Sequence, residues 1–394
     1  MKPLIPSRLL LISELFLPTK GGTTVWYDAV YRRLGGKSVH IVTAAVPGAE
    51  AIDRDHPNSL HRVALKRVWW LKPESLGMYL KMLGLSLRVA LRHRLDAVHG
   101  ARALPEGLVA WLMARLLRVP LLVYCHGEEL STWGRGRKFR TMLWVYRHAD
   151  ANIANSEYTL EEMVRLGVRR ESITLVYPGV DTERFRPGLP CGDLLAGLGL
   201  REGQKLILSV GRLVRRKGFD QVIRALPDLV KRGLDVHYAL IGIGEDWDML
   251  TDLARELGVS ERLHLQGHVS PEDLPRWYNA CDVFVMANRE INGDTEGFGM
   301  VFLEAAACGK PAIAGDAGGT AAAVVEGVTG YRVDGNHTES VANALYTVLA
   351  DPSLASRLAL SGLERAKAEF SWDCVAEKTR ALASRPGSRA YPAR

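Results

Sequence analysis

The stretch Lys205-Leu206-Ile207-Leu208-Ser209-Val210, continued by Gly211-Arg212-Leu213-Val214-Arg215-Arg216-Lys217-Gly218, decides the fold class of this chain. The apolar run predicts a buried strand. A glycine ends that strand, and Arg212 and Lys217 follow five positions apart, an arrangement that indicates a binding loop for a diphosphate. A buried strand that opens a helical pattern is the unit from which parallel α/β sheets are built.

A second informative stretch is Glu296-Gly297-Phe298-Gly299-Met300-Val301-Phe302-Leu303-Glu304. The glycines allow backbone N–H groups to approach a ligand closely, and the following helix offers its positive end. Eight helical residues rise roughly 12 Å, whereas paired hydrolase carboxylates lie roughly 5 to 9.5 Å apart. We therefore interpret the two glutamates as clamps on opposite ends of one long ligand. The alternative is that Glu296 caps a helix and Glu304 is a solvated residue or lies at the edge of the core.

Short apolar runs alternate with helical patterns along the whole chain, which predicts an α/β protein with two doubly wound sheets. In the first half the predicted strands are 9–13, 39–44, 96–99, 121–125, 151–154 and 174–177. In the second half they are 206–210, 238–242, 263–266, 283–286 and 312–314.

The amino-acid composition becomes rich in Pro and Gly near residues 185–192, which predicts the boundary between two Rossmann-like domains. We expect a first domain at 1–187, a linker at 188–203, a second domain at 204–370, a helix at 371–385 that returns to the first domain, and a tail at 386–394. Because ligands bind beyond the carboxyl ends of parallel strands, we expect the site in a cleft between the domains.

Composition agrees with a globular enzyme: 394 residues, 47% hydrophobic and 24% charged. The apolar run near the N-terminus is short and predicts a strand rather than a membrane span or signal peptide. Five cysteines without a Cys-x-x-Cys pattern indicate a reduced, cytoplasmic setting and no structural zinc.

Charge is concentrated in the first half, where residues 1–190 contain 28 Lys and Arg against 17 Asp and Glu. Residues 61–94 contain eight basic residues, one acid and several aromatic and apolar residues. This composition indicates peripheral binding to an anionic membrane at its cytoplasmic face. The alternative is an ordinary amphipathic helix packed on its own domain. Because no nucleic-acid motif with stacking aromatics occurs, nucleic acid is not expected as a partner.

Several further motifs, in order, resemble the retaining glycosyltransferases of family 4, also called group 1, which have the GT-B fold. They are Gly21-Gly22, Tyr124-Cys125-His126-Gly127-Glu128, Asn155-Ser156-Glu157-Tyr158-Thr159, Pro178-Gly179-Val180-Asp181, Cys308-Gly309-Lys310-Pro311 and Gly318-Gly319. Together with the two stretches above, the resemblance covers nearly the whole chain.

The resemblance implies metal-independent transfer of a hexose from a nucleotide-diphosphate sugar, with retention of configuration and without a cofactor. It implies that Arg212 and Lys217 neutralise the leaving diphosphate and that His126 stabilises and positions the sugar. Glu296, with the backbone of Phe298, Gly299, Met300 and Val301, would bind the sugar hydroxyls, Glu304 the ribose, and Gly22 the diphosphate or the acceptor. No motif identifies residues that bind the acceptor.

Two Asp-x-Asp patterns, Asp53-Arg54-Asp55 and Asp246-Trp247-Asp248, could suggest a metal-dependent transferase. We interpret the first as part of a polar loop and the second as a helix start, because aspartate caps helices and favours the first turn. No metal site is therefore expected.

Two departures from the family pattern bear on the substrate. Thr320-Ala321-Ala322-Ala323 lacks the glutamate that many relatives have after the paired glycines. The long polar segment 288–295 is similar to that of bacterial mannosyltransferases acting on phosphatidylinositol mannosides, which favours GDP-mannose over a UDP-sugar. The expected acceptor is a glycolipid or cell-surface glycan. Alternatives are a GT-B epimerase or phosphorylase and a non-catalytic sugar-nucleotide-binding module.

Overall fold

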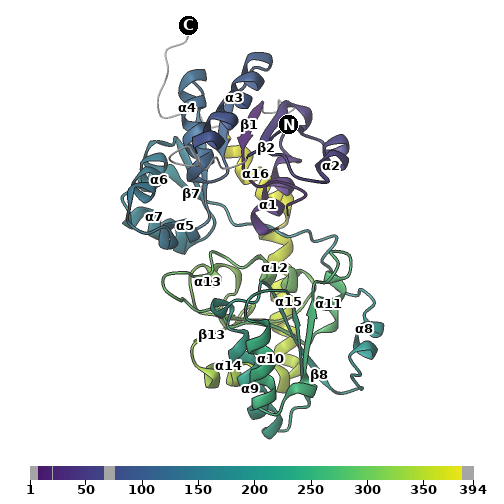
Figure 1. Ribbon diagram of the computed structural model, residues 1–394. Coiled ribbons are helices and arrows are strands. Elements are labelled where there is room, and N and C mark those ends of the chain that lie inside the picture. Colours follow the sequence, from purple (N-terminus) through teal and green to yellow (C-terminus); the bar gives the residue numbers. More distant parts are fainter. Residues whose placement is uncertain (1–7, 20, 66–75, 384–394) are drawn as a thin grey trace. The chain divides into compact units, whose positions relative to one another are not determined.

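The computed structural model describes residues 8–19, 21–65 and 76–383, and the chain divides into two compact units. Unit 1 contains Met1–Pro178 and Trp372–Arg394, and unit 2 contains Gly179–Ser371. Each unit is a parallel sheet with helices between the strands, shown in Figure 1. The prediction of two doubly wound, Rossmann-like folds is confirmed.

Unit 1 has a seven-stranded sheet with the order β3-β2-β1-β4-β5-β6-β7. The order reverses between β1 and β4, and ligands of open α/β sheets bind beyond the carboxyl ends of strands at such a point. The strands are β1 (Leu9–Ile12), β2 (Val39–Ala44), β3 (Ser59–Val63), β4 (Ala97–Gly100), β5 (Leu121–Cys125), β6 (Ala151–Ala154) and β7 (Ile173–Leu175). The α-helices are α1 (Gly22–Tyr31), α2 (Ala49–Asp55), α3 (Leu76–Arg92), α4 (Leu108–Leu117), α5 (Glu128–Thr132), α6 (Arg137–His148), α7 (Glu157–Arg165) and α16 (Trp372–Ala383).

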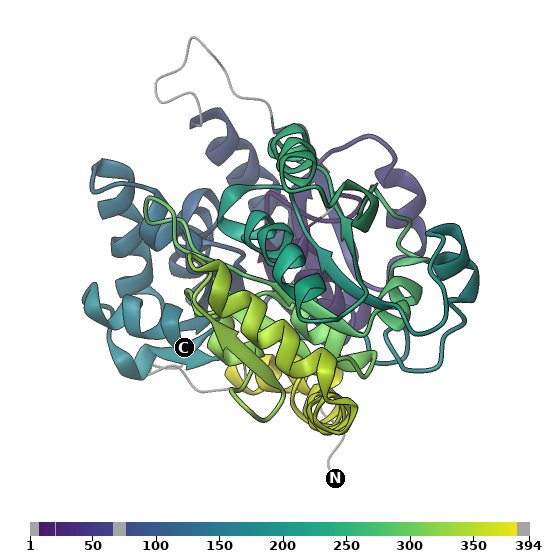
Figure 2. The same ribbon diagram turned by 90° about the horizontal axis from the view of Figure 1, so that it is seen from below.

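Unit 2 has a six-stranded sheet with the order β10-β9-β8-β11-β12-β13, which reverses between β8 and β11. The strands are β8 (Lys205–Val210), β9 (Val236–Ile241), β10 (Leu263–Gly267), β11 (Val283–Met286), β12 (Ala312–Gly315) and β13 (Gly330–Val333). The α-helices are α8 (Gly192–Gly197), α9 (Phe219–Lys231), α10 (Trp247–Glu256), α11 (Leu274–Ala280), α12 (Met300–Ala307), α13 (Thr320–Ala323), α14 (Thr338–Ala350) and α15 (Pro352–Glu369). Figure 2 shows the yellow-green α14 and α15, which pack against each other within this unit.

The helix at the C-terminus belongs to unit 1 although its sequence follows unit 2. Helix α16 packs on α1, and the two are side by side in Figure 1. Arg33 Nε donates to Asp373 Oδ1 at 2.7 Å, and Arg380 Nη2 donates to the Arg33 carbonyl at 2.6 Å. These bonds join the turn that follows α1 to α16.

The predicted linker at 188–203 is wrong, because the division between the units falls at Pro178–Gly179. The Pro- and Gly-rich segment is attached to unit 2 by side chains of α11 that bond to its backbone. Arg276 Nε donates to the Pro190 carbonyl at 2.9 Å, and Asn279 Oδ1 accepts from the Leu189 N–H at 3.2 Å. Local composition indicates where a chain turns, but only such distant contacts decide to which unit a turn belongs.

Two strands were missed in the sequence, and both lie at the edge of a sheet. All five residues of β3 are half-buried, and two residues of β13, Tyr331 and Arg332, are half-buried. The predicted strands were recognised as continuous apolar runs, which are typical of strands covered on both faces. Polar residues such as Arg62 in β3 and Arg332 in β13, which edge strands tolerate, interrupt that signal.

None of the helices within the described residues is long and apolar enough to cross a membrane.

Candidate functional site

Strand β8 leads directly into a basic loop, residues 211–218, which positions three consecutive cations in unit 2. Arg215–Lys217 form a single 3-10 turn, and α9 begins immediately after Gly218. Gly218 has a φ of +70°, and a Cβ atom there would lie 1.9 Å from the Ala287 carbonyl oxygen. Only glycine allows this close approach to the end of β11. The position of Lys217 is therefore fixed by the backbone beside it.

Lys217 and Glu296, predicted separately from two distant stretches, meet in unit 2. The Lys217 ammonium donates to Glu296 Oε2, and Arg216 Nη1 donates to the same oxygen at 3.1 Å. Asn288 Nδ2 lies 3.3 Å from this oxygen. Burial opposes ionisation of Glu296, but the adjacent Lys217 and Arg216 overcome it and lower the pKa of this carboxyl. Glu296 is therefore an ionised acceptor between two cations.

Arg212 is placed differently from Lys217. Its side chain is exposed and contributes to a hollow of about 380 Å³ on the surface of unit 2. The hollow is lined by Arg212, Val214, Arg215, Arg216, Glu245, Ile291 and Asp294. Arg216, which sequence reasoning passed over, lies between this hollow and Glu296. The basic run Arg215-Arg216-Lys217 could have indicated a role for Arg216, but the sequence does not show which of these side chains faces Glu296.

The glycine-rich segment after Glu296 is held in place through its backbone. The Gly319 N–H donates to the Glu296 carbonyl at 2.7 Å. Gly299 precedes α12 with a φ of +89°, and a Cβ atom there would lie 2.7 Å from the Phe302 ring. The Phe298 side chain is buried and contacts the Phe370 ring edge-on. Since that side chain belongs to the core, a ligand can reach only the backbone of Phe298.

Glu304 lies one turn into α12, and its carboxylate accepts a hydrogen bond from a phenol. Tyr278 OH donates to Glu304 Oε2 at 2.7 Å. Burial raises the pKa of Glu304 to about 7, although the hydrogen bond from Tyr278 opposes this shift. At neutral pH this carboxyl therefore exchanges between its acceptor form and its protonated form.

A buried ion pair that the sequence did not reveal supports the segment that leads to Glu296. Arg289 Nη2 donates to both carboxylate oxygens of Asp220, at 2.8 and 3.0 Å. Its Nη1 donates to the Gly335 carbonyl at 3.2 Å, and its backbone N–H donates to the Arg216 carbonyl at 2.9 Å. Asp220 lies in the first turn of α9, so the pair connects this segment to the basic loop.

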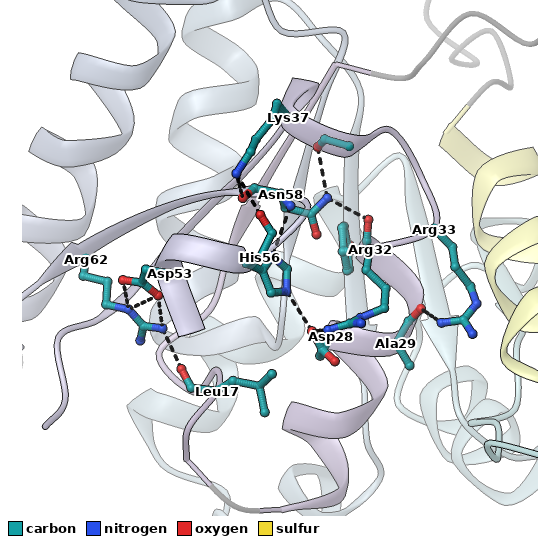
Figure 3. Close-up of polar contacts among 12 residues, drawn as sticks. Leu17, Asp28, Ala29, Arg32, Arg33, Lys37, Asp53, His56, Asn58 and Arg62 are labelled. Atoms are coloured by element: carbon teal, nitrogen blue, oxygen red, sulfur yellow. Dashed lines mark hydrogen bonds and ion pairs between the residues drawn. The ribbon is translucent and has the colours of Figure 1, made fainter. Parts of the chain in front are cut away.

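The structure accounts for the two Asp-x-Asp patterns by other roles. Asp53 and Asp55 lie in α2 and not in the predicted polar loop. Figure 3 shows Asp53 bound to Arg62, and Arg62 Nη2 lies 2.6 Å from Asp53 Oδ1. In the second pattern α10 begins at Trp247, directly after Asp246, and Asp248 lies in its first turn, as predicted, but the Asp246 side chain makes no capping hydrogen bond. Within residues 8–19, 21–65 and 76–383 no group of three or more metal-ligating side chains is gathered.

His126 follows β5 in unit 1 and is surrounded by aromatic rings. The Trp26 ring meets it edge-on at 5.6 Å between centroids, and the Tyr124 ring lies nearly parallel to it at 6.5 Å. Its Nε2 lies 2.6 Å from Tyr27 OH and 3.1 Å from the Ala101 carbonyl oxygen. Burial lowers the pKa of His126, which favours a neutral imidazole at neutral pH.

The backbone of His126 is fixed by side chains of two further elements. Its N–H donates to Glu129 Oε1 at 3.1 Å, and its carbonyl accepts from Asn155 Nδ2 at 2.8 Å. Tyr146 OH donates to the same Glu129 oxygen at 2.7 Å. The motifs around His126 and Asn155, distant in sequence, therefore form one hydrogen-bonded arrangement.

Gly22 is exposed and is the first residue of α1. The preceding Gly21 has a φ of +146°, which favours glycine. The same helix carries Trp26 and Tyr27, so the glycine turn positions the aromatic side chains against His126.

Arg102 and Glu106, which the sequence did not single out, lie beyond the end of β4. Glu106 is buried, and its Oε1 accepts from the Glu14 N–H at 3.0 Å and lies 3.8 Å from Arg102 Nε. Its Oε2 has no hydrogen-bond partner in the described part of the chain. Burial raises the pKa of Glu106 to about 7. No sequence motif marks this pair, because it depends on the meeting of β1 and β4.

Family models match most of the chain in two adjoining parts. Residues 20–184 match the model described as Glycosyltransferase Family 4, and residues 194–365 match the model described as Glycosyl transferases group 1. The chain belongs to this glycosyltransferase family. It is a glycosyltransferase that uses a nucleotide sugar, and the resemblance found in the sequence motifs is confirmed.

Relatives of this glycosyltransferase include two kinds of enzyme. It is 31% identical to a GDP-mannose-dependent alpha-(1-6)-phosphatidylinositol monomannoside mannosyltransferase of Mycolicibacterium smegmatis, over 92% of the chain and 95% of the relative. It is 33% identical to a D-inositol 3-phosphate glycosyltransferase of Nocardiopsis dassonvillei, over 70% of the chain and 67% of the relative.

Solved structures confirm the fold of the glycosyltransferase. Anabaena Alr3699/HepE in complex with UDP has a TM-score of 0.82 at 21% identity, covering 96% of this chain and 99% of that one. Sucrose-phosphate synthase from Thermosynechococcus elongatus has a TM-score of 0.76 at 22% identity, covering 95% and 98%. The fold is therefore GT-B.

Proposed function

We propose that the glycosyltransferase moves mannose from GDP-mannose to a glycolipid or cell-surface glycan, with retention of configuration and without a metal ion or cofactor. A UDP-sugar is the second candidate donor. Support for mannose comes from the relative that matches 92% of the chain, whose name specifies GDP-mannose and a phosphatidylinositol mannoside. Retention is proposed because it is expected from the family resemblance.

The observation that carries the proposal is the pairing of Lys217 and Arg216 with Glu296. A diphosphate that enters the basic loop gains charge-assisted hydrogen bonds from these cations and from Arg212. Glu296, held ionised, accepts hydrogen bonds from sugar hydroxyls. One cluster therefore binds the sugar and stabilises the negative charge that develops on the leaving diphosphate.

Metal independence is proposed from the number of cations beside the diphosphate position. Arg212, Arg215 and Arg216 line one hollow, and Lys217 follows them in the same loop. Mg²⁺ in transferases bridges phosphate oxygens and neutralises their charge. Guanidinium and ammonium groups can supply that neutralisation, so activity in the presence of EDTA is expected.

Thermal stabilisation by nucleotides in the presence of EDTA tests the donor site. We expect GDP and GDP-mannose to raise the melting temperature of the wild type, and we expect Arg212→Ala and Glu304→Ala to lose most of this shift.

The affinity for GDP should fall by up to about tenfold for each pH unit below 7, because the ribose hydroxyls require the ionised Glu304. The Glu304→Gln variant should bind weakly at every pH, whereas Glu256→Gln, at an exposed position of α10, should keep the wild-type pH dependence.

The same preparation separates the alternative functions. Release of free GDP with a new glycosidic bond supports transfer, and NMR spectroscopy of the product anomer decides between retention and inversion. Interconversion of sugar nucleotides, or consumption of inorganic phosphate, would indicate an epimerase or a phosphorylase. Tight donor binding without any turnover would indicate a non-catalytic module.

We also propose that unit 1 binds the cytoplasmic face of an anionic membrane, where a lipid acceptor would be reached. Leu80 and Leu91 on α3 are 58% and 86% exposed, and Leu116 on the adjacent α4 is 63% exposed. Arg88 and Arg92 of α3 are exposed as well. Exposed leucines beside arginines fit an interfacial helix.

Part of the predicted membrane segment, residues 61–94, does not bear on this proposal. Lys66, Arg67, Trp69, Trp70 and Lys72 lie outside the described residues. Arg62 is bound to Asp53 and donates to the Leu17 carbonyl at 2.7 Å, as Figure 3 shows. Its charge is thus already compensated within the unit.

Sedimentation with vesicles of phosphatidylglycerol and phosphatidylcholine tests the membrane proposal. The Leu80→Glu and Leu116→Glu variants are expected to lose most of the bound fraction, because each places a carboxylate at an anionic surface. The control is Leu360→Glu on α15, which is similarly exposed at 59% but lies in unit 2. Equal loss in all three variants, or no binding by the wild type, would contradict the proposal.

A further inference from the structure

The surroundings of His126 fix which of its ring nitrogens carries hydrogen. Three atoms lie within hydrogen-bonding distance of one another: Tyr27 OH, the Ala101 carbonyl oxygen and His126 Nε2. A carbonyl oxygen only accepts, so the single phenol proton of Tyr27 is directed to Ala101. Tyr27 then has no second proton to donate to the histidine.

Among the residues that the structure describes, Nε2 of His126 therefore has two acceptor oxygens within hydrogen-bond distance and no donor. A bare Nε2 would direct its lone pair at the lone pairs of the phenol and carbonyl oxygens, at 2.6 and 3.1 Å. An Nε2–H group turns both contacts into hydrogen bonds. In a neutral imidazole the other nitrogen is then an acceptor.

Nδ1 of His126 is the nitrogen that remains for a ligand. Within the described part of the chain it makes no hydrogen bond, and it is not one of the buried polar atoms that lack a partner. The ring cannot turn to exchange its nitrogens without breaking the Nε2 contacts, and Trp26 and Tyr124 pack against it.

We propose that Tyr27 is a positioning residue that holds His126 in its Nε2–H form, so that Nδ1 accepts a hydrogen bond from a substrate hydroxyl. The inference rests on the proposed function and specifies how the substrate is recognised. The ligand group at Nδ1 is a hydrogen-bond donor, such as a sugar or cyclitol hydroxyl, and not a phosphate or carboxylate oxygen. His126 thus orients a hydroxyl and does not supply a proton to the leaving group.

Nitrogen NMR spectroscopy of protein labelled with ¹⁵N-histidine tests the tautomer directly. The signals of His126 are identified by their absence in His126→Asn. We expect the wild type to show a protonated Nε2 and a bare Nδ1. The Tyr27→Phe variant should move toward a mixture of tautomers, because it removes one of the two oxygens that hold Nε2–H. A protonated Nδ1 in the wild type would overturn the proposal.

Kinetics of two His126 variants test which nitrogen acts. The asparagine amide oxygen of His126→Asn can replace Nδ1 as an acceptor, whereas the amide of His126→Gln extends toward the Nε2 position. We expect kcat/KM to fall about 10-fold in the His126→Asn variant and about 100-fold in the His126→Gln variant. A higher activity of His126→Gln than of His126→Asn would show that the substrate contacts Nε2 and would refute the proposal.

Tyr31→Phe is the matched control for Tyr27→Phe. Tyr31 lies on the same helix, is buried, and bonds another histidine, with its OH 2.6 Å from His99 Nδ1. We expect Tyr27→Phe to lower kcat/KM about 10-fold and Tyr31→Phe to leave the His126 signals unchanged. Equal effects of the two changes on activity and on these signals would reduce Tyr27 to a structural role. Nucleotide binding is measured for every variant; its absence in the wild type would refute the proposed function, while the NMR result still reports on the tautomer.

Discussion

Replacing Lys217 by alanine is expected to lower kcat by about 10²–10³-fold while the protein stays folded. The ammonium group contacts Glu296 directly and follows the arginines that line the hollow of unit 2. Without it, the charge that develops on the diphosphate loses a preorganised donor. Arg216 still lies 3.1 Å from Glu296 Oε2, so the carboxylate keeps one cation and the fold is retained.

Steady-state release of GDP, with melting temperatures measured in parallel, checks this expectation. Lys205→Ala is the matched control, because Lys205 lies at the opposite end of β8 and also pairs with a carboxylate, Asp282, at 3.1 Å. The control should keep nearly full activity. A Lys217→Ala enzyme with more than half of the wild-type kcat would contradict the assignment of charge stabilisation to this lysine.

Replacing Arg289 by methionine is expected to lower the free energy of unfolding of unit 2 by about 3–5 kcal/mol. Arg289 and Asp220 are 8% and 7% exposed, and the variant leaves the buried aspartate with only the more distant Arg215, whose Nη1 lies 3.9 Å from Asp220 Oδ2. The guanidinium also donates to the Gly335 carbonyl. Because the pair connects the segment before Glu296 to α9, we expect donor binding to weaken as well.

Chemical denaturation of the purified variants measures this change. Arg232→Met is the control, since Arg232 pairs with Asp228 at 2.7 Å at the C-terminal end of α9, where both side chains are partly exposed. Its expected change is below about 1 kcal/mol. The double variant Arg289→Met with Asp220→Leu should regain much of the lost stability, because it removes both buried charges. Equal losses at Arg289 and Arg232 would show that the buried pair has no special role.

The extent to which the strands could be predicted depended on their burial. The predicted bounds of β2, β5, β6 and β11 match the structure, because each of these strands is an apolar run that lies inside its sheet. The edge strands β3 and β13 were missed, since Arg62 and Arg332 interrupt their apolar runs. Turn composition likewise marked residues 185–192 but not their attachment to α11.

Only those residues of the candidate site that stand in sequence motifs were predicted. Glu296, Lys217, Glu304, Arg212 and His126 stand in motifs with recognisable spacing, and the structure brings Lys217 and Glu296 together within unit 2. Arg216, Arg289 and Tyr27 were not singled out, because nothing in their local sequence distinguishes them from other arginines and tyrosines. Their roles depend on partners 80, 69 and 99 residues away in the chain.

The sequence by itself determined the α/β class, the glycine positions at which the backbone passes closely over its neighbours, and the membership in a glycosyltransferase family. These properties are local, since they follow from apolar runs, from the absence of a Cβ atom and from the order of short motifs. Only the tertiary structure decided which cation of the basic loop meets Glu296 and which nitrogen of His126 is available. Both depend on hydrogen bonds between side chains that are distant in sequence, and such bonds form only once the strands have assembled.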